Sequence, residues 1–65
     1  MAGNKLARVA LKIVDLLHRQ PDLRQTEIAR KLGEYDSTVM RALPLTDTLG
    51  VRLAEDDYGR LSIAE

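Results

Sequence analysis

The hydrophobic positions change their period along the chain, and the change separates a helical part from a hairpin. Between residues 4 and 19, apolar side chains follow one another at intervals of three and four, while most charged side chains lie opposite. This pattern predicts a first helix over about residues 4–19. Pro21 ends it, because proline disfavours a helical conformation in the residue before it. Leu23 and Arg24 are predicted to form a short strand.

Two more helices are predicted, over about residues 25–32 and 36–49. The first has an apolar stripe and ends at Gly33, which suits a left-handed cap. The second has Asp36 or Ser37 in position to act as its N-cap. The residues predicted to face the core from these two helices are Ile28, Ala29, Leu32, Val39, Ala42, Leu43 and Leu49.

Pro44 interrupts the third helix. Inside an α-helix, a proline lacks the N–H that bonds to the carbonyl four residues earlier, and its ring clashes with that carbonyl, at a cost of about 3 kcal/mol or more. In the first turn of a helix the same residue is tolerated. We therefore expect a helix that is kinked at Pro44 or split there.

From residue 51 to residue 64 apolar and polar residues alternate, which predicts two strands. A three-residue loop with Gly59 in the left-handed conformation closes the hairpin and pairs Leu53 with Ile63. The order helix, strand, helix, helix, strand, strand predicts a mainly α fold with a small β-hairpin, the three-helix winged helix-turn-helix. Its 65 residues form a single domain over 1–65, with residues 51–64 as the wing.

Composition narrows the function. There is no Cys and no apolar run of 18 residues, which fits a cytoplasmic protein without membrane contact. There is no glycine-rich phosphate loop, and His18 is the single histidine, so we expect no enzyme activity, cofactor or metal site. The net charge is zero, but residues 1–31 carry +4 and residues 32–65 carry −4.

The segments TEIARKLG and STVMRAL, followed by LG before the hairpin, resemble the winged helix-turn-helix domains of bacterial and archaeal transcription regulators. The N-terminal domain of IclR-type regulators is the most similar, and MarR-type and ArsR-type domains are also similar. The resemblance covers about residues 6–63. It implies double-stranded DNA as the partner, with the third helix in the major groove and the wing on the flanking backbone. The effector-binding domain of IclR-type regulators has no counterpart here, so no small-molecule effector is implied.

The resemblance also implies the residues that contact DNA. Ser37, Thr38 and Arg41 open the recognition helix and are candidates for base or phosphate contacts, although capping explains the first two equally well. Arg52 and Arg60 are candidates in the wing. Apart from the resemblance, Gln25 and Thr26 begin the second helix, whose N-terminal amides suit a phosphate, although the usual polarity of a first turn explains both residues equally well. The alternative for Arg41 is a solvated arginine paired with Asp36 or Asp47.

The sequence departs from the family pattern at four positions. Glu34 and Tyr35 stand where an apolar residue and a Ser or Thr cap are usual, so we expect a turn one residue longer, with Asp36 as the cap. Thr46 stands where a Leu is usual, and Pro44 is not typical. These departures leave the fold in place and affect the orientation of the recognition helix.

Two hypotheses about function remain open. The first is sequence-specific binding of double-stranded DNA, with a homodimer on paired half-sites. The second is a winged helix that binds protein, because the −4 charge of the half holding the third helix and the wing repels phosphate. It would attract a basic protein partner, or the basic first helix of a second copy.

Overall fold

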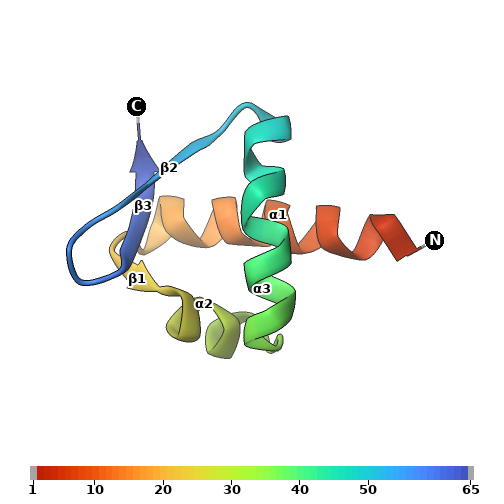
Figure 1. Ribbon diagram of the computed structural model, residues 1–65, viewed down its shortest axis with the longest axis horizontal. Coiled ribbons are helices and arrows are strands. Elements are labelled where there is room, and N and C mark those ends of the chain that lie inside the picture. The colour runs from red at the N-terminus through yellow and green to blue at the C-terminus, as the bar shows by residue number, and fades with distance from the viewer. Residues whose placement is uncertain (1, 65) are drawn as a thin grey trace.

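The computed structural model describes residues 2–64, and the side chains of residues 5–64. Its elements are α1 (Ala2–Arg19), β1 (Leu23–Arg24), α2 (Gln25–Leu32), α3 (Asp36–Ala42), the 3-10 helix η1 (Leu43–Leu49), β2 (Arg52–Glu55) and β3 (Arg60–Ala64). The predicted fold class, mainly helical with a small hairpin, is confirmed, and α1 begins two residues earlier than predicted. Figure 1 shows α3 and η1 as one column that crosses α1, with the strands to one side.

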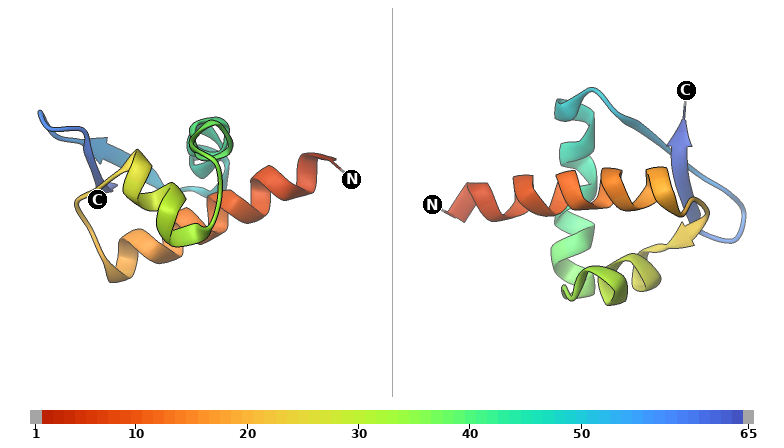
Figure 2. Two further views of the ribbon diagram at one scale, coloured as in Figure 1. Left: turned by 90° about the horizontal axis from the view of Figure 1, so that it is seen from below. Right: turned by 180° about the vertical axis from the view of Figure 1, so that it is seen from behind.

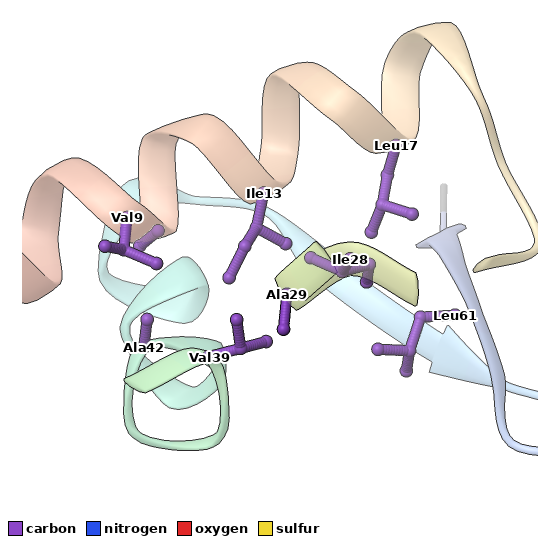
Figure 3. Packing of buried hydrophobic residues seen from close by; sticks show 9 residues of the cluster. Val9, Ile13, Leu17, Ile28, Ala29, Val39, Ala42 and Leu61 are labelled. Atoms are coloured by element: carbon purple, nitrogen blue, oxygen red, sulfur yellow. The ribbon is translucent and has the colours of Figure 1, made fainter. Parts of the chain in front are cut away.

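The core lies where α1, α2 and α3 meet. Val9, Ile13 and Leu17 project from one side of α1 at helical spacing, as their pattern predicts, and are almost completely buried. Figure 3 shows them facing residues of α2 and α3 and, beside Leu17, a residue of the hairpin. The other buried members of the core are Ala10, Ile28, Ala29, Val39, Ala42 and Leu61.

The predicted interruption at Pro44 is a split between two kinds of helix. The N–H of Leu43 donates to the carbonyl of Val39 in the α-helical manner. Pro44 has no N–H to continue the series, and the chain proceeds as the 3-10 helix η1 with Pro44 in its first turn. A seven-residue 3-10 helix is long for its kind. Hydroxyls stabilise it, since Thr46 Oγ1 donates to the Leu43 carbonyl at 2.8 Å and Thr48 Oγ1 to the Leu45 carbonyl at 2.6 Å.

The predicted N-cap and part of the predicted buried side of the third helix are wrong. The N-cap is Tyr35, whose carbonyl accepts the N–H groups of Thr38 and Val39, and Asp36 belongs to the first turn. Thr46 is buried, whereas Leu49, the last residue of η1 before the left-handed Gly50, is exposed. Leu43 is half-buried against the core. Because its hydroxyl is hydrogen-bonded within η1, Thr46 is accommodated where an apolar residue is usual.

The strands form an antiparallel sheet in the order β1-β3-β2. Leu53 pairs with Ile63, as predicted, and Gly59 has the left-handed conformation (φ 77°) in the three-residue loop. Leu61 is buried, and Leu53 and Ile63 pack on the core from the same face of the sheet. A two-stranded hairpin is marginal in water, so these contacts hold the wing in place. Within residues 2–64, no helix has both the length and the apolar character needed to cross a membrane.

We predict that Ile13→Val lowers the free energy of unfolding by about 0.5–1.5 kcal/mol, because Ile13 is completely buried and the lost methylene leaves a cavity. Urea unfolding followed by circular dichroism measures the change. Leu11→Ala is the matched control, since Leu11 lies on the same helix but is 56% exposed, and it should shift stability by less than about 0.5 kcal/mol. Equal losses in the two variants would contradict the assignment of the core face of α1.

Candidate nucleic-acid interface

Strand β1 joins the wing to the start of α2. Arg24 in β1 pairs directly with Arg60 in β3, and Leu23 pairs with Leu61. Directly opposite residues of an antiparallel pair project from the same face. Leu61 points into the core, so Arg24 and Arg60 project together from the outer face, and both are exposed. The register thus sets a wing arginine beside the residue that immediately precedes α2.

The N-termini of α2 and α3 are tied together. The backbone N–H of Arg24, the N-cap residue of α2, donates to the Glu27 carboxylate at 3.0 Å. The Arg24 side chain does not cap the helix, and the bond to Glu27 is the part of a capping box in which the N3 side chain accepts the N–H of the N-cap residue. One residue later, the Gln25 amide nitrogen donates to the Asp36 carbonyl at 3.3 Å, which connects the first turns of the two helices. Gln25 is half-buried in this position, whereas Thr26 is exposed.

The outward side of α3 carries the polar residues predicted for base contact. Ser37 and Arg41 are four residues apart and therefore lie on the same face. Both are exposed, as is Met40, and Thr38 is half-buried. No side-chain hydroxyl caps this helix, so capping does not account for Ser37 and Thr38. No carboxylate among the described residues lies within 4.0 Å of the Arg41 guanidinium, so the predicted alternative pairing with Asp36 or Asp47 is absent there.

Arg60 is held at the tip of the wing by interactions within the loop. Its guanidinium Nε donates to the Asp56 carboxylate at 2.7 Å, and its Cζ lies 5.1 Å from the centre of the Tyr58 ring. The same carboxylate accepts the backbone N–H groups of Tyr58 and Arg60, each at 2.9 Å. The hydrogen bond from the Arg60 backbone contributes most to lowering the pKa of Asp56 below its ordinary value, and desolvation opposes the shift.

Six of the seven predicted site residues lie on segments that are joined to one another by strand pairing and one hydrogen bond, and together they are called the candidate surface. The candidate surface runs from Arg60 across the strand pairing to Gln25 and Thr26, and through the Gln25–Asp36 hydrogen bond to the residues of α3, Ser37, Thr38 and Arg41. Arg52 is not part of it. It pairs with Ala64, four residues along β3 from Arg60, and so lies on the outer face about 13 Å away toward the base of the hairpin.

Arg24 belongs to this surface and was not among the predicted site residues. Its place depends on the pairing of β1 with β3, which connects residues far apart in the sequence. The available signal was the predicted strand at Leu23-Arg24, whose alternation with the buried Leu23 puts Arg24 on the opposite face. Like charges directly opposite each other on a sheet are unfavourable, and an anion close to Arg24 and Arg60 would relieve their repulsion.

Compared with known proteins, the chain matches no family model, no curated protein and no solved structure. The resemblance to IclR-type domains therefore stays a prediction from its motifs. What the structure establishes is the arrangement of the elements and of the residues on this surface.

We predict that the wing tip loosens in acid. A lowered folded-state pKa means that Asp56 contributes stability above the ordinary aspartate range, about pH 3.9, and that this contribution is lost as the pH falls through the lowered pKa. An NMR titration of the Asp56 carboxyl carbon should give a lower midpoint in the folded chain than in the urea-unfolded chain. In Asp56→Asn, the acid-induced shifts of the Tyr58 and Arg60 amides should disappear. Equal midpoints in the two states would contradict the role of these hydrogen bonds.

Proposed function

We propose that this protein binds double-stranded DNA as a transcription regulator of the cytoplasm. Helix α3 enters the major groove, and the wing and the N-terminus of α2 contact the flanking phosphates. The observation that supports this most directly is the series of contacts from Arg60 through Arg24 and Gln25 to the first turn of α3, on which Arg41 is exposed one turn further along. A short helix followed by a second helix whose first residues contact base edges is the docking geometry of helix-turn-helix proteins.

The residues of the candidate surface divide between the two tasks of DNA recognition. Arg41 and Ser37 lie on the exposed side of α3, where an arginine can bond to guanine O6 and N7 together and a hydroxyl to several base edges. Arg24 and Arg60 suit phosphates, which position a protein without selecting a sequence. Thr26 is in the first turn of α2, where backbone N–H groups and the helix dipole attract an anion.

The acidic residues limit the affinity of one copy. Asp36 is exposed in the first turn of α3, and Asp57 is exposed at the wing tip. Asp56 offsets part of the charge of Arg60, and Glu27 accepts the N–H of Arg24. Because binding depends on the number of phosphates neutralised, a single 65-residue module makes few such contacts. Two copies on paired half-sites supply more.

The first step of the test selects the duplexes that the protein binds from a pool of random sequences, because its target sequence is not known. Fluorescence anisotropy of an enriched duplex at about 20–200 mM salt then measures affinity and its salt dependence. We expect binding at low salt that weakens as salt rises, with an enriched sequence preferred over a scrambled duplex. Absence of binding at the lowest salt would refute the proposal.

A groove beside the same surface favours a second candidate, the binding of a basic protein segment. It measures about 320 Å³ and lies between the α3–η1 column and β2, with apolar walls from Met40, Leu43, Pro44 and Leu53. Asp47 and Glu55 also line it. Apolar walls with acidic groups suit an amphipathic basic segment. Chemical-shift mapping separates the candidates, because DNA should affect Ser37 and Arg41, whereas a protein segment should affect Leu53 and Glu55 of the groove.

We predict that Arg41→Ala weakens binding to the enriched duplex by about 1–3 kcal/mol and relaxes the sequence preference at one position, because the lost group contacts a base. Lys12→Ala is the control, since Lys12 is an exposed basic residue of α1 and lies outside the proposed surface. The two variants remove the same charge. If both variants weaken binding equally, Arg41 acts only through long-range attraction of the DNA. If neither variant weakens binding, Arg41 does not belong to the interface.

We predict a different result for Arg24→Ala. A phosphate contact carries no sequence information, so affinity should fall by a similar factor for the enriched and the scrambled duplex, and the salt slope should decrease by about 1. Anisotropy titrations of both duplexes at several salt concentrations measure this. A loss confined to the enriched duplex would instead place Arg24 at a base, and an unchanged slope would exclude the phosphate contact.

A further inference from the structure

One side of α1 does not face the core and carries three apolar residues and one histidine. Ala7, Leu11, Val14 and His18 follow one another at intervals of four, three and four residues, so they lie along one side of the helix. Val14 is half-buried and the other three are exposed, and none belongs to the core or to the apolar residues packed on it. Seen from behind in Figure 2, α1 lies in front of α2, α3 and the sheet. These four residues are called the outer stripe.

We propose that the outer stripe is the contact through which two copies of this chain form an antiparallel, two-fold symmetric dimer. Alternating intervals of four and three are the spacing with which two helices pack along a common seam. The stripe lies on the longest helix of the structure, and Leu11 at its centre is 56% exposed. A large apolar side chain of this kind on a helix surface favours a partner helix with the same spacing.

The sizes of the side chains favour the antiparallel arrangement. With the two-fold axis between residues 12 and 13, Leu11 faces Val14 of the second copy, and Ala7 faces His18. Each layer then joins a larger side chain to a smaller one, which fills the space between the helices evenly. In a parallel pair in register, Ala7 would face Ala7 and leave a gap, and His18 would face His18 and crowd it.

The charges beside the stripe favour the same arrangement. Arg8 follows Ala7 and Asp15 follows Val14, so both flank the same edge of the stripe. An antiparallel dimer brings Arg8 of each copy opposite Asp15 of the other and forms two ion pairs between opposite charges. A parallel dimer lacks them, because the other edge is formed by Ala10 and Leu17, which are buried in the core of their own chain. Asp15 also pairs with Arg19 in its own helix, but the pair is exposed and such pairs contribute little.

The dimer is weak, because the stripe is short. From residue 7 to residue 18 the helix rises about 16 Å, and a contact of this length is smaller than a standard protein interface. Association is therefore expected only at high protein concentration. It does not depend on DNA, so its test is independent of the proposed function.

Sedimentation equilibrium between about 10 μM and 1 mM protein tests the proposal, since this range spans the midpoint of a weak dimer. The apparent mass should rise from the 7.3 kDa of one chain toward twice that value. Leu11→Asp should reduce the association constant at least about tenfold, because it places a charge in the seam. Met40→Asp is the matched control, since Met40 is also 56% exposed but lies on α3. Its association should be unchanged.

A charge exchange tests the orientation. Arg8→Asp and Asp15→Arg should each weaken association about threefold, because each sets like charges opposite one another, and the double variant should return it to within about twofold of the original. Lys12→Asp makes the same charge change as Arg8→Asp on the same helix but outside the seam, and it should have little effect. Circular dichroism and thermal melting at low concentration confirm that each variant is folded.

Three results would overturn the proposal. The first is a single-chain mass at every concentration. The second is dissociation by Met40→Asp with Leu11→Asp unaffected, which would place the contact on α3. The third is a double variant that associates no more strongly than either single variant, which would exclude the antiparallel pairing. DNA titrations at micromolar protein, where the chain is a monomer, show separately whether the proposed function holds.

Discussion

The pairing of β1 with β3 is the contact on which the rest of the candidate surface depends. It consists of two residue pairs and of the hydrogen bond from the Asp22 N–H to the Leu61 carbonyl at 2.9 Å. A strand of two residues contributes little stability by itself. It is sufficient here because Leu61 is buried between α1 and α2 (Figure 3), so that core packing and strand pairing fix the same residue. Without this pairing the wing would have no defined position relative to α2 and α3.

The same pairing has an electrostatic cost that the loop partly offsets. Arg24 and Arg60 are directly opposite, and Asp56 is bonded to Arg60 from the other side. In the isolated chain this carboxylate reduces the repulsion and also organises the loop through its two backbone hydrogen bonds. A phosphate near both arginines would compete with Asp56 for Arg60. Asp56 therefore does not prevent Arg60 from binding a phosphate, because the ion pair between the two side chains is exposed and such pairs are weak.

The sequence predicts the elements well because each has a strong local signal. Periodicity identifies α1, Gly33 and Gly59 mark positions that require left-handed backbone, and Pro44 marks the split of the third helix. The wrong predictions have a common cause, because each concerns a position that depends on how the chain continues or pairs outside its own segment. Leu49 is apolar, but it lies at the end of η1, where the chain turns at Gly50, and is exposed. Arg24 joins the candidate surface only through a pairing between distant segments.

Helix α1 connects the stability of the fold to the proposed association. A domain of 65 residues buries a smaller fraction of its surface than a larger domain does. Among the residues whose side chains are described, nine apolar residues make up the buried core, three of them large residues of α1. The outer stripe lies on the same helix, so a partner that covers it also restricts fraying of α1. Binding to the folded state alone stabilises that state by mass action. A dimer through the outer stripe would therefore add stability to the element that contributes most to the core, without changing α3 or the wing.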